Sequence, residues 1–175
     1  MFKRKINSND IVISLKSYND IFSSLDPRPF INRSTSHDLL SELKRATKDK
    51  DYNGINLKFT IPKSKRKANI EKIIRLRLKD HFEKHFEILR KERVNHIKNG
   101  LIYAISGIIL MILGTLVSMF MDEKTFFEHF LVILLEPGGW FLFWEGMYLS
   151  VFDSRYKTPD YEFYKKMIKS KVLFI

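Results

Sequence analysis

Two carboxylates inside a long apolar segment are the residues with the clearest chemical potential. Phe130–Phe152 spans 23 residues and carries only two charges, Glu136 and Glu145. A carboxylate within a membrane costs about 2.5–3.5 kcal/mol even on insertion scales, so it should face protein or water. Each glutamate could be protonated or paired and serve assembly alone. A ring of carboxylates around a water-filled pore would instead favour cations. We favour the pore role for Glu136, while both roles stay open for Glu145.

The residues directly after Glu136 should disturb a helix. Proline followed by two glycines, Pro137-Gly138-Gly139, predicts a kink or a break. Backbone groups freed in this way are tolerated within a membrane only beside protein or a water-lined cavity. Glu136 would lie roughly 10 Å deep if the segment is helical. The pattern therefore predicts that Glu136 faces protein or a lumen rather than lipid.

A stripe of small residues runs along the preceding apolar segment. Its members follow a 4-3-4-3-4 spacing, which is a heptad seam: Gly100, Ala104, Gly107, Met111, Gly114 and Ser118. Small residues let membrane helices approach closely, which matters because lipid supplies no hydrophobic drive for association. The seam either packs the two membrane helices of one subunit, or joins neighbouring subunits or faces a lumen. In the second case the pore-lining candidates are Gly107, Met111, Gly114 and Ser118.

One stretch of 17 residues contains eight cationic side chains and a single acidic one, Glu71. The cationic residues are Lys63, Lys65, Arg66, Lys67, Lys72, Arg75, Arg77 and Lys79. Lys72 precedes the first apolar segment by roughly 43 Å along a straight helix. This distance exceeds the Debye length of about 8 Å in physiological salt. Unless the chain folds back, the cluster would meet a cytosolic polyanion such as RNA, or line a vestibule, rather than bind lipid. A solvated helix face is the simplest alternative.

The spacing of two histidines gives only weak support for a metal site. His81 and His85 are four residues apart and would share one helix face, as metal ligands do. No third ligand is evident, and the spacing differs from the metalloprotease motif. We therefore expect no metal site, and nothing in the sequence implies a cofactor.

An arginine and a histidine fit a loose nuclease pattern. Arg90 and His96 match the Arg-x(4–6)-His spacing of HEPN-type ribonucleases, in which Asn, His or Asp usually follows the arginine. Here Lys91 follows it, and His96 lies only five residues before the apolar segment. The sequence contains neither a nucleotide-binding loop nor a nucleophile triad. We expect the motif to be degenerate and the protein not to be an enzyme.

The segregation of the apolar residues excludes several classes of protein. Leu101–Met121 has 21 residues without a charge, and with Phe130–Phe152 it provides two segments long enough to cross about 30 Å of hydrocarbon. This excludes a fully soluble protein. The absence of cysteine among 175 residues excludes a disulfide scaffold and a cysteine metal site. Without residues 101–152 only 123 remain, too few for a large enzyme.

The distribution of charge predicts an orientation in the membrane. The basic N-terminus is not followed by the apolar region of a signal peptide, so we expect the first span to direct insertion. Of the 31 Lys and Arg residues, 24 precede residue 101, one lies in residues 101–152 and six follow. The positive-inside rule then places both termini in the cytoplasm. Only the loop Asp122–His129 would face the other side.

The flanking segments predict a small α+β domain. Short β-branched or alternating runs predict strands at residues 10–15, 55–61 and 171–175. A helix at residues 37–48 would begin at a capping box formed by Thr35 and Asp38. An isolated apolar C-terminus would be odd, so we expect it to return and pair with the N-terminal strands in one sheet.

One long helix should join this domain to the membrane, because residues 68–121 contain no proline. The predicted fold class is a mostly α membrane protein. It has a two-helix transmembrane hairpin, a long cytoplasmic helical extension and a small α+β cytoplasmic domain built from both ends of the chain. The expected divisions are residues 1–68 for the N-terminal part, 69–100 for the amphipathic basic helix, 101–152 for the two spans and 153–175 for the C-terminal helix and strand.

In layout, the chain resembles the small membrane accessory proteins encoded beside RNA-targeting effectors in type VI-B CRISPR loci. The likeness covers the length, the basic cytoplasmic part, the apolar hairpin and the degenerate motif at Arg90 and His96. It implies an oligomeric inner-membrane pore that depolarises the membrane and strengthens antiviral defence after viral RNA is cut. The expected partners are the lipid bilayer, further copies of the chain, and RNA or an RNA-guided effector complex.

Two functional hypotheses from different classes follow. In the first, the protein oligomerises into a pore that is gated from its cytoplasmic domain. In the second, the hairpin serves only as a tether, and the basic domain holds RNA or a protein partner. Ion flux in liposomes distinguishes them, because a tether predicts none.

Overall fold

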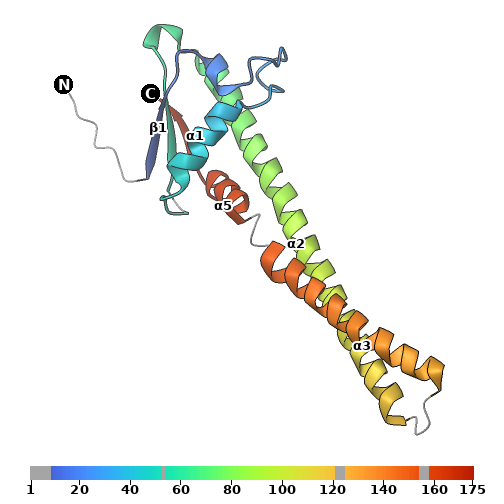
Figure 1. Cartoon of the computed structure of the whole chain (residues 1–175). Coiled ribbons are helices and arrows are strands. Elements are labelled where there is room, and N and C mark those ends of the chain that lie inside the picture. Colours follow the sequence, from blue (N-terminus) through green and yellow to red (C-terminus); the bar gives the residue numbers. More distant parts are fainter. Residues whose placement is uncertain (1–8, 53, 121–124, 154–157) are drawn as a thin grey trace. The chain divides into compact units, whose positions relative to one another are not determined.

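The computed structural model describes residues 9–52, 54–120, 125–153 and 158–175, and the chain divides into two compact units (Figure 1). Met1–Ile88 and Pro159–Ile175 form the sheet unit, and Leu89–Thr158 form the hairpin unit. One helix, α2 (Ala68–Phe120), contributes to both. Its 53 residues correspond to about 80 Å of helix, which confirms the prediction of a single long helix.

A three-stranded parallel sheet lies at the centre of the sheet unit. Its strands are β1 (Asp10–Ser14), β2 (Asn56–Thr60) and β3 (Lys171–Phe174), in the order β1-β2-β3. The C-terminal strand pairs with β2, as the sequence predicted, and Phe174 lies opposite Phe59.

The alternation of residues in the sequence determines which side chains of β2 lie on each face of the sheet. Leu57 and Phe59 on β2 are fully buried, whereas Asn56 and Lys58, each directly before one of them, are half-buried. Successive strand residues point to opposite faces, so this alternation assigns one apolar and one polar face to the sheet. On the polar face, Asp10 accepts hydrogen bonds from the side chains of Asn56 and Lys58.

Helices complete the core of the sheet unit. They are α1 (His37–Thr47), α5 (Thr158–Met167), two short 3-10 helices at Tyr18–Ile21 and Lys63–Lys65, and the first part of α2. Helix α5 meets α2 through three pairs of rings: Phe82 with Phe163, His85 with Tyr164, and Phe86 with Tyr161. These ring contacts pack α5 against the first part of α2.

The predicted capping box at the start of α1 is wrong. Ser36 occupies the cap position and makes no side-chain cap hydrogen bond. Thr35 instead forms an isolated antiparallel bridge with Phe22 and is buried there. A capping box occurs earlier, at the 3-10 helix, where Ser17 and Asp20 bond reciprocally.

The hairpin unit contains the second part of α2 and helix α3 (Phe126–Met147), which a π-helical turn extends over Tyr148–Asp153. Helix α3 continues through Pro137, so the predicted interruption does not break the helix. By length and composition, α2 and the helical segment His129–Phe152 can each cross a membrane. Their apolar windows are only 17% and 11% buried within the chain, unlike the core helix of a soluble protein.

Candidate functional site

Glycines form the contact between α2 and α3. A Cβ added to Gly107 would lie 2.5 Å from the carbonyl oxygen of Gly139 and 2.6 Å from the amide nitrogen of Phe143. A Cβ added to Gly139 would in turn lie 2.7 Å from the carbonyl oxygen of Gly107. Atoms do not approach this closely, so neither position can hold a side chain without moving backbone. The two helices therefore touch backbone to backbone, as small residues allow.

The same contact repeats along the hairpin. Seven residues before Gly107, Gly100 faces Gly146. Seven residues after Gly107, Gly114 faces Leu135 and Glu136. Gly139 and Gly146 are seven residues apart, which matches the spacing on α2. The seven-residue spacing of Gly139 and Gly146, which the sequence analysis did not use, is the signal that could have identified this pairing.

The seam has a partner within the chain. The face that carries Gly107 and Gly114 is covered by α3 of the same chain, as the first alternative, packing within one subunit, requires. Met111 belongs to this interface, because its side chain lies against Gly139. Ser118 is half-buried near the end of α2. The faces that α3 leaves uncovered lie elsewhere on the hairpin, and Met111 also borders one of them.

Glu136 lies on such an outer face. Its aliphatic part rests near Gly114, while the residue as a whole is exposed. The carboxylate makes no hydrogen bond or ion pair with any residue that the structure describes. It lines an open groove of about 540 Å³ with Met111, Thr115, Pro137 and Trp140. Thr115 donates its hydroxyl proton to the carbonyl oxygen of Met111, so its own oxygen can still accept.

Glu145 occupies a different groove. It lies nine residues after Glu136, which is about half a turn round the helix, so the two carboxylates point to different sides of α3. An aromatic groove of about 300 Å³ surrounds it, formed by Phe141, Trp144, Tyr148 and Phe152. Glu145 is half-buried and also lacks a polar partner among the described residues. One pore cannot be lined by both glutamates on the same face of α3.

Two of the eight predicted polyanion-binding residues, Arg66 and Arg75, bind the buried Glu71. Arg66 donates to both carboxylate oxygens of the buried Glu71 and to the carbonyl oxygen of Phe174. Arg75 also donates to Glu71 and lies over the ring of Phe174. These hydrogen bonds, chiefly that from Arg66, lower the pKa of Glu71 against the opposing effect of burial. Both arginines therefore stabilise the sheet unit.

The other cations divide into two groups. Arg77 donates to the carbonyl oxygen of Arg33 and to Asp80, Lys65 donates to the carbonyl oxygen of Lys16, and Lys79 lies 3.7 Å from Glu83. The side chains of Lys63, Lys67 and Lys72 are exposed and have no partner among the described residues. Of the predicted cluster of eight, these three lysines around the start of α2 are thus the ones whose side chains have no partner among the described residues.

The nuclease-like pair is not brought together by the fold. Arg90 and His96 lie on the same helix, six residues apart, which separates them by about 9 Å along the axis and about 120° around it. One chain therefore does not place the two side chains at a single reacting atom.

His81 and His85 are neighbours, with ring centroids 4.4 Å apart. His85 stacks on Tyr164, and His81 is buried with its Nε2 atom lacking a hydrogen-bond partner among the described residues. Burial lowers the pKa of His81 to about 4, and the nearby His85 and Arg77 add to the effect. Among the described residues, no group of three or more His, Cys, Asp or Glu side chains could hold a metal. The pair packs α2 against α5.

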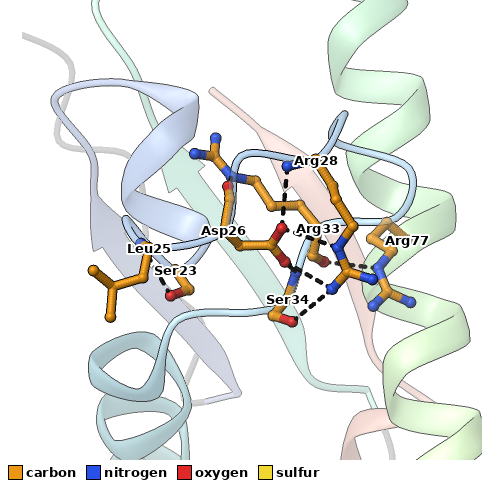
Figure 2. A network of polar contacts seen from close by, with 7 residues as sticks. All are labelled: Ser23, Leu25, Asp26, Arg28, Arg33, Ser34 and Arg77. Atoms are coloured by element: carbon orange, nitrogen blue, oxygen red, sulfur yellow. Dashed lines mark hydrogen bonds and ion pairs between the residues drawn. The ribbon is translucent and has the colours of Figure 1, made fainter.

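Sequence reasoning missed a polar network in the loop between Phe22 and Thr35 (Figure 2). The Asp26 carboxylate accepts from Nε and Nη2 of Arg28, at 2.9 and 2.8 Å, and from the amide of Ser34 at 2.7 Å. These bonds, led by those from Arg28, hold the pKa of Asp26 far below its usual value. The Asp-Pro-Arg-Pro sequence signalled a rigid turn, but the partner at Ser34 is eight residues away and not apparent from it.

Comparisons of the chain with protein-family models, with curated proteins and with solved structures found no match.

Proposed function

We propose that the chain crosses a bacterial inner membrane twice and assembles with further copies into a pore. The observation that carries this proposal is the Glu136 carboxylate, which lies within an apolar span and has no polar partner among the described residues. Such a group is too costly to leave in lipid. It needs water or a second protein surface, and a lumen between copies supplies water.

The packing of the hairpin narrows how such a pore would be built. Its close-approach face is already occupied within one chain, so copies would meet through outer faces. The groove at Glu136 also contains Thr115, a second polar side chain. We assign this groove to the lumen, where each copy would add one carboxylate at the same depth. A ring of this kind attracts cations.

The orientation and biological role belong to the same proposal. The excess of Lys and Arg outside the spans favours cytoplasmic termini. The resemblance in layout to accessory proteins of type VI-B CRISPR loci favours a role in antiviral defence, in which the pore would depolarise the membrane. The sheet unit would then regulate how often the pore opens.

Ion flux through reconstituted liposomes tests the proposal. The wild-type protein should conduct, and reversal potentials across a salt gradient should show a preference for cations. Glu136→Gln should keep assembly but lower this preference, because it removes charge and keeps shape. Glu145→Gln is the matched control: it has the same chemistry at comparable depth on another side of α3, and it should leave selectivity unchanged. Absence of flux, or identical selectivity of Glu136→Gln and wild type, would contradict the proposal.

A membrane-tethered binding module is the second candidate. The exposed Lys63, Lys67 and Lys72 side chains favour it, because each is available to an anionic partner. Such a module would bind single-stranded RNA in a salt-dependent manner and would conduct no ions. Replacing the three lysines by glutamine should then abolish RNA binding, whereas a pore should keep its conductance.

A further inference from the structure

Leu25 is an unusual surface residue. Its side chain is 92% exposed, whereas the next most exposed large apolar side chain described in the sheet unit, Leu76, reaches 54%. A single exposed leucine needs no explanation by itself. The question is whether the surrounding structure presents it for a purpose.

The loop that carries Leu25 is held rigidly. Asp26, the next residue, accepts the hydrogen bonds of Arg28 and Ser34 described above, and its carbonyl oxygen accepts from Nε of Arg33 at 2.5 Å. Pro27 and Pro29 further restrict the backbone. A side chain on such a loop loses little conformational freedom when it binds, which favours association.

An apolar pocket of about 290 Å³ lies in the same unit. It is lined by Arg28, Pro29, Phe30, Ile31, Arg33 and Ile73. Ile31 and Ile73 are 47% and 37% exposed, so the pocket offers apolar surface that the chain itself leaves uncovered. The pocket therefore suits one aliphatic side chain.

The leucine and the pocket belong to different surfaces of one copy. In Figure 2, Leu25 points away from Arg28, which lines the pocket, and from α2, which carries Ile73. A copy cannot fill its own pocket with its own leucine. Two complementary patches at different places on one molecule give a head-to-tail contact, which forms a ring when the rotation between copies closes.

We propose that Leu25 of one copy inserts into the pocket formed by Phe30, Ile31 and Ile73 of the next, so that sheet units join head to tail in a ring. This inference rests on the proposed pore, because it supplies the contact that arranges the copies. A second copy is the occupant that the chain itself provides, since it carries both the exposed leucine and the aliphatic pocket.

Disulfide trapping tests the contact directly, because the chain contains no cysteine. The double variants Leu25→Cys/Ile73→Cys and Leu25→Cys/Ile31→Cys should be oxidised with copper phenanthroline in native membranes. Each should give a ladder of covalent species that ends at the subunit number of the ring. A mixture of chains that carry only Leu25→Cys with chains that carry only Ile73→Cys should stop at dimers, because each such chain has one reactive position.

The control pair is Leu25→Cys/Val12→Cys, in which the second cysteine lies on an exposed strand residue that does not line the pocket. It should give no ladder. The mass of each reduced variant in detergent verifies that assembly is intact. An intact wild-type oligomer without a ladder for either pocket pair overturns the inference and leaves the proposed pore standing. A ladder of equal yield in the control pair also overturns it. A monomeric wild-type protein overturns both proposals.

Discussion

The carboxylates of the two units differ in whether the chain itself provides their hydrogen-bond donors. In the sheet unit, the buried Asp26 and Glu71 each accept several hydrogen bonds from arginines of the same unit. In the hairpin unit, Glu136 and Glu145 have no polar partner among the described residues. A carboxylate whose partners lie within the chain stabilises the fold. One without them needs a partner from outside, so the hairpin unit is where assembly and function should be sought.

The units also differ in how they pack. The sheet unit buries large side chains, among them Phe59, Phe82 and Leu43. The hairpin unit brings backbones together at glycines and leaves its large side chains outside. The first arrangement is driven by removing apolar surface from water, and the second is useful where the surroundings are themselves apolar. The contrast agrees with the proposal that the hairpin unit, but not the sheet unit, lies in lipid.

Deleting residues 171–175 should have the largest effect. The deletion removes β3 and with it Phe174, which packs on Phe59 and Tyr18. Losing a buried phenylalanine alone costs about 3–5 kcal/mol, so the sheet unit should unfold. Hydrogen exchange of the β2 amides, followed by mass spectrometry on the full chain, should become fast. Leu173→Thr is the control, since Leu173 is 41% exposed. Protected β2 amides in the truncated protein would contradict the role of β3.

Gly107→Leu should open the hairpin at a cost of about 3 kcal/mol or more, because the new side chain meets backbone atoms of α3. Unfolding in SDS can be followed by tryptophan fluorescence, since both tryptophans, Trp140 and Trp144, lie on α3. Gly138→Leu provides the matched control, because no atom of the described residues lies within 4 Å of a Cβ added there. Equal stability of the two variants would mean that the seam does not hold the hairpin together.

The regular elements were predictable because local patterns determine them. Alternation in Ile55–Ile61 identified β2, and the absence of proline identified α2. The start of α1 was not predictable, because Thr35 is taken by a bridge to Phe22, thirteen residues earlier. A local capping rule cannot foresee such a tertiary contact.

The candidate site was only partly predictable for a related reason. The basic run around Arg66 and Arg75 looked like a binding surface, but the acceptors include the carbonyl oxygen of Phe174, near the other end of the chain. Sequence spacing reveals a cluster of charge without revealing which charges a fold uses. The seam at Gly107 was ambiguous because small residues serve packing within and between subunits alike.

Exchanging one carboxylate for an amide in each unit should distinguish a carboxylate that is hydrogen-bonded within the chain from one that is not. Glu71→Gln should destabilise the sheet unit by about 2 kcal/mol, because it weakens charge-assisted hydrogen bonds whose arginines are partly exposed. Glu136→Gln should not destabilise the hairpin, because no described partner loses a bond. Hydrogen exchange of both units in each variant measures the difference. A loss of hairpin stability in Glu136→Gln would show that its carboxylate serves the fold.

The smallest effect should come from mild acid acting on His81 in the sheet unit. Burial lowers the pKa of His81 to about 4, below its value of 6.5 in an unfolded chain. Between these values the unfolded chain binds more protons, so stability falls as pH falls. Lowering the pH from 7 to 5.5 should cost about 1 kcal/mol from this residue. Hydrogen exchange of the α5 amides measures how stability depends on pH. His81→Leu cannot titrate at this position and should make that dependence weaker. His37→Gln, on the surface of α1, should leave the pH dependence unchanged. An unchanged slope in His81→Leu would assign the acid sensitivity to other groups.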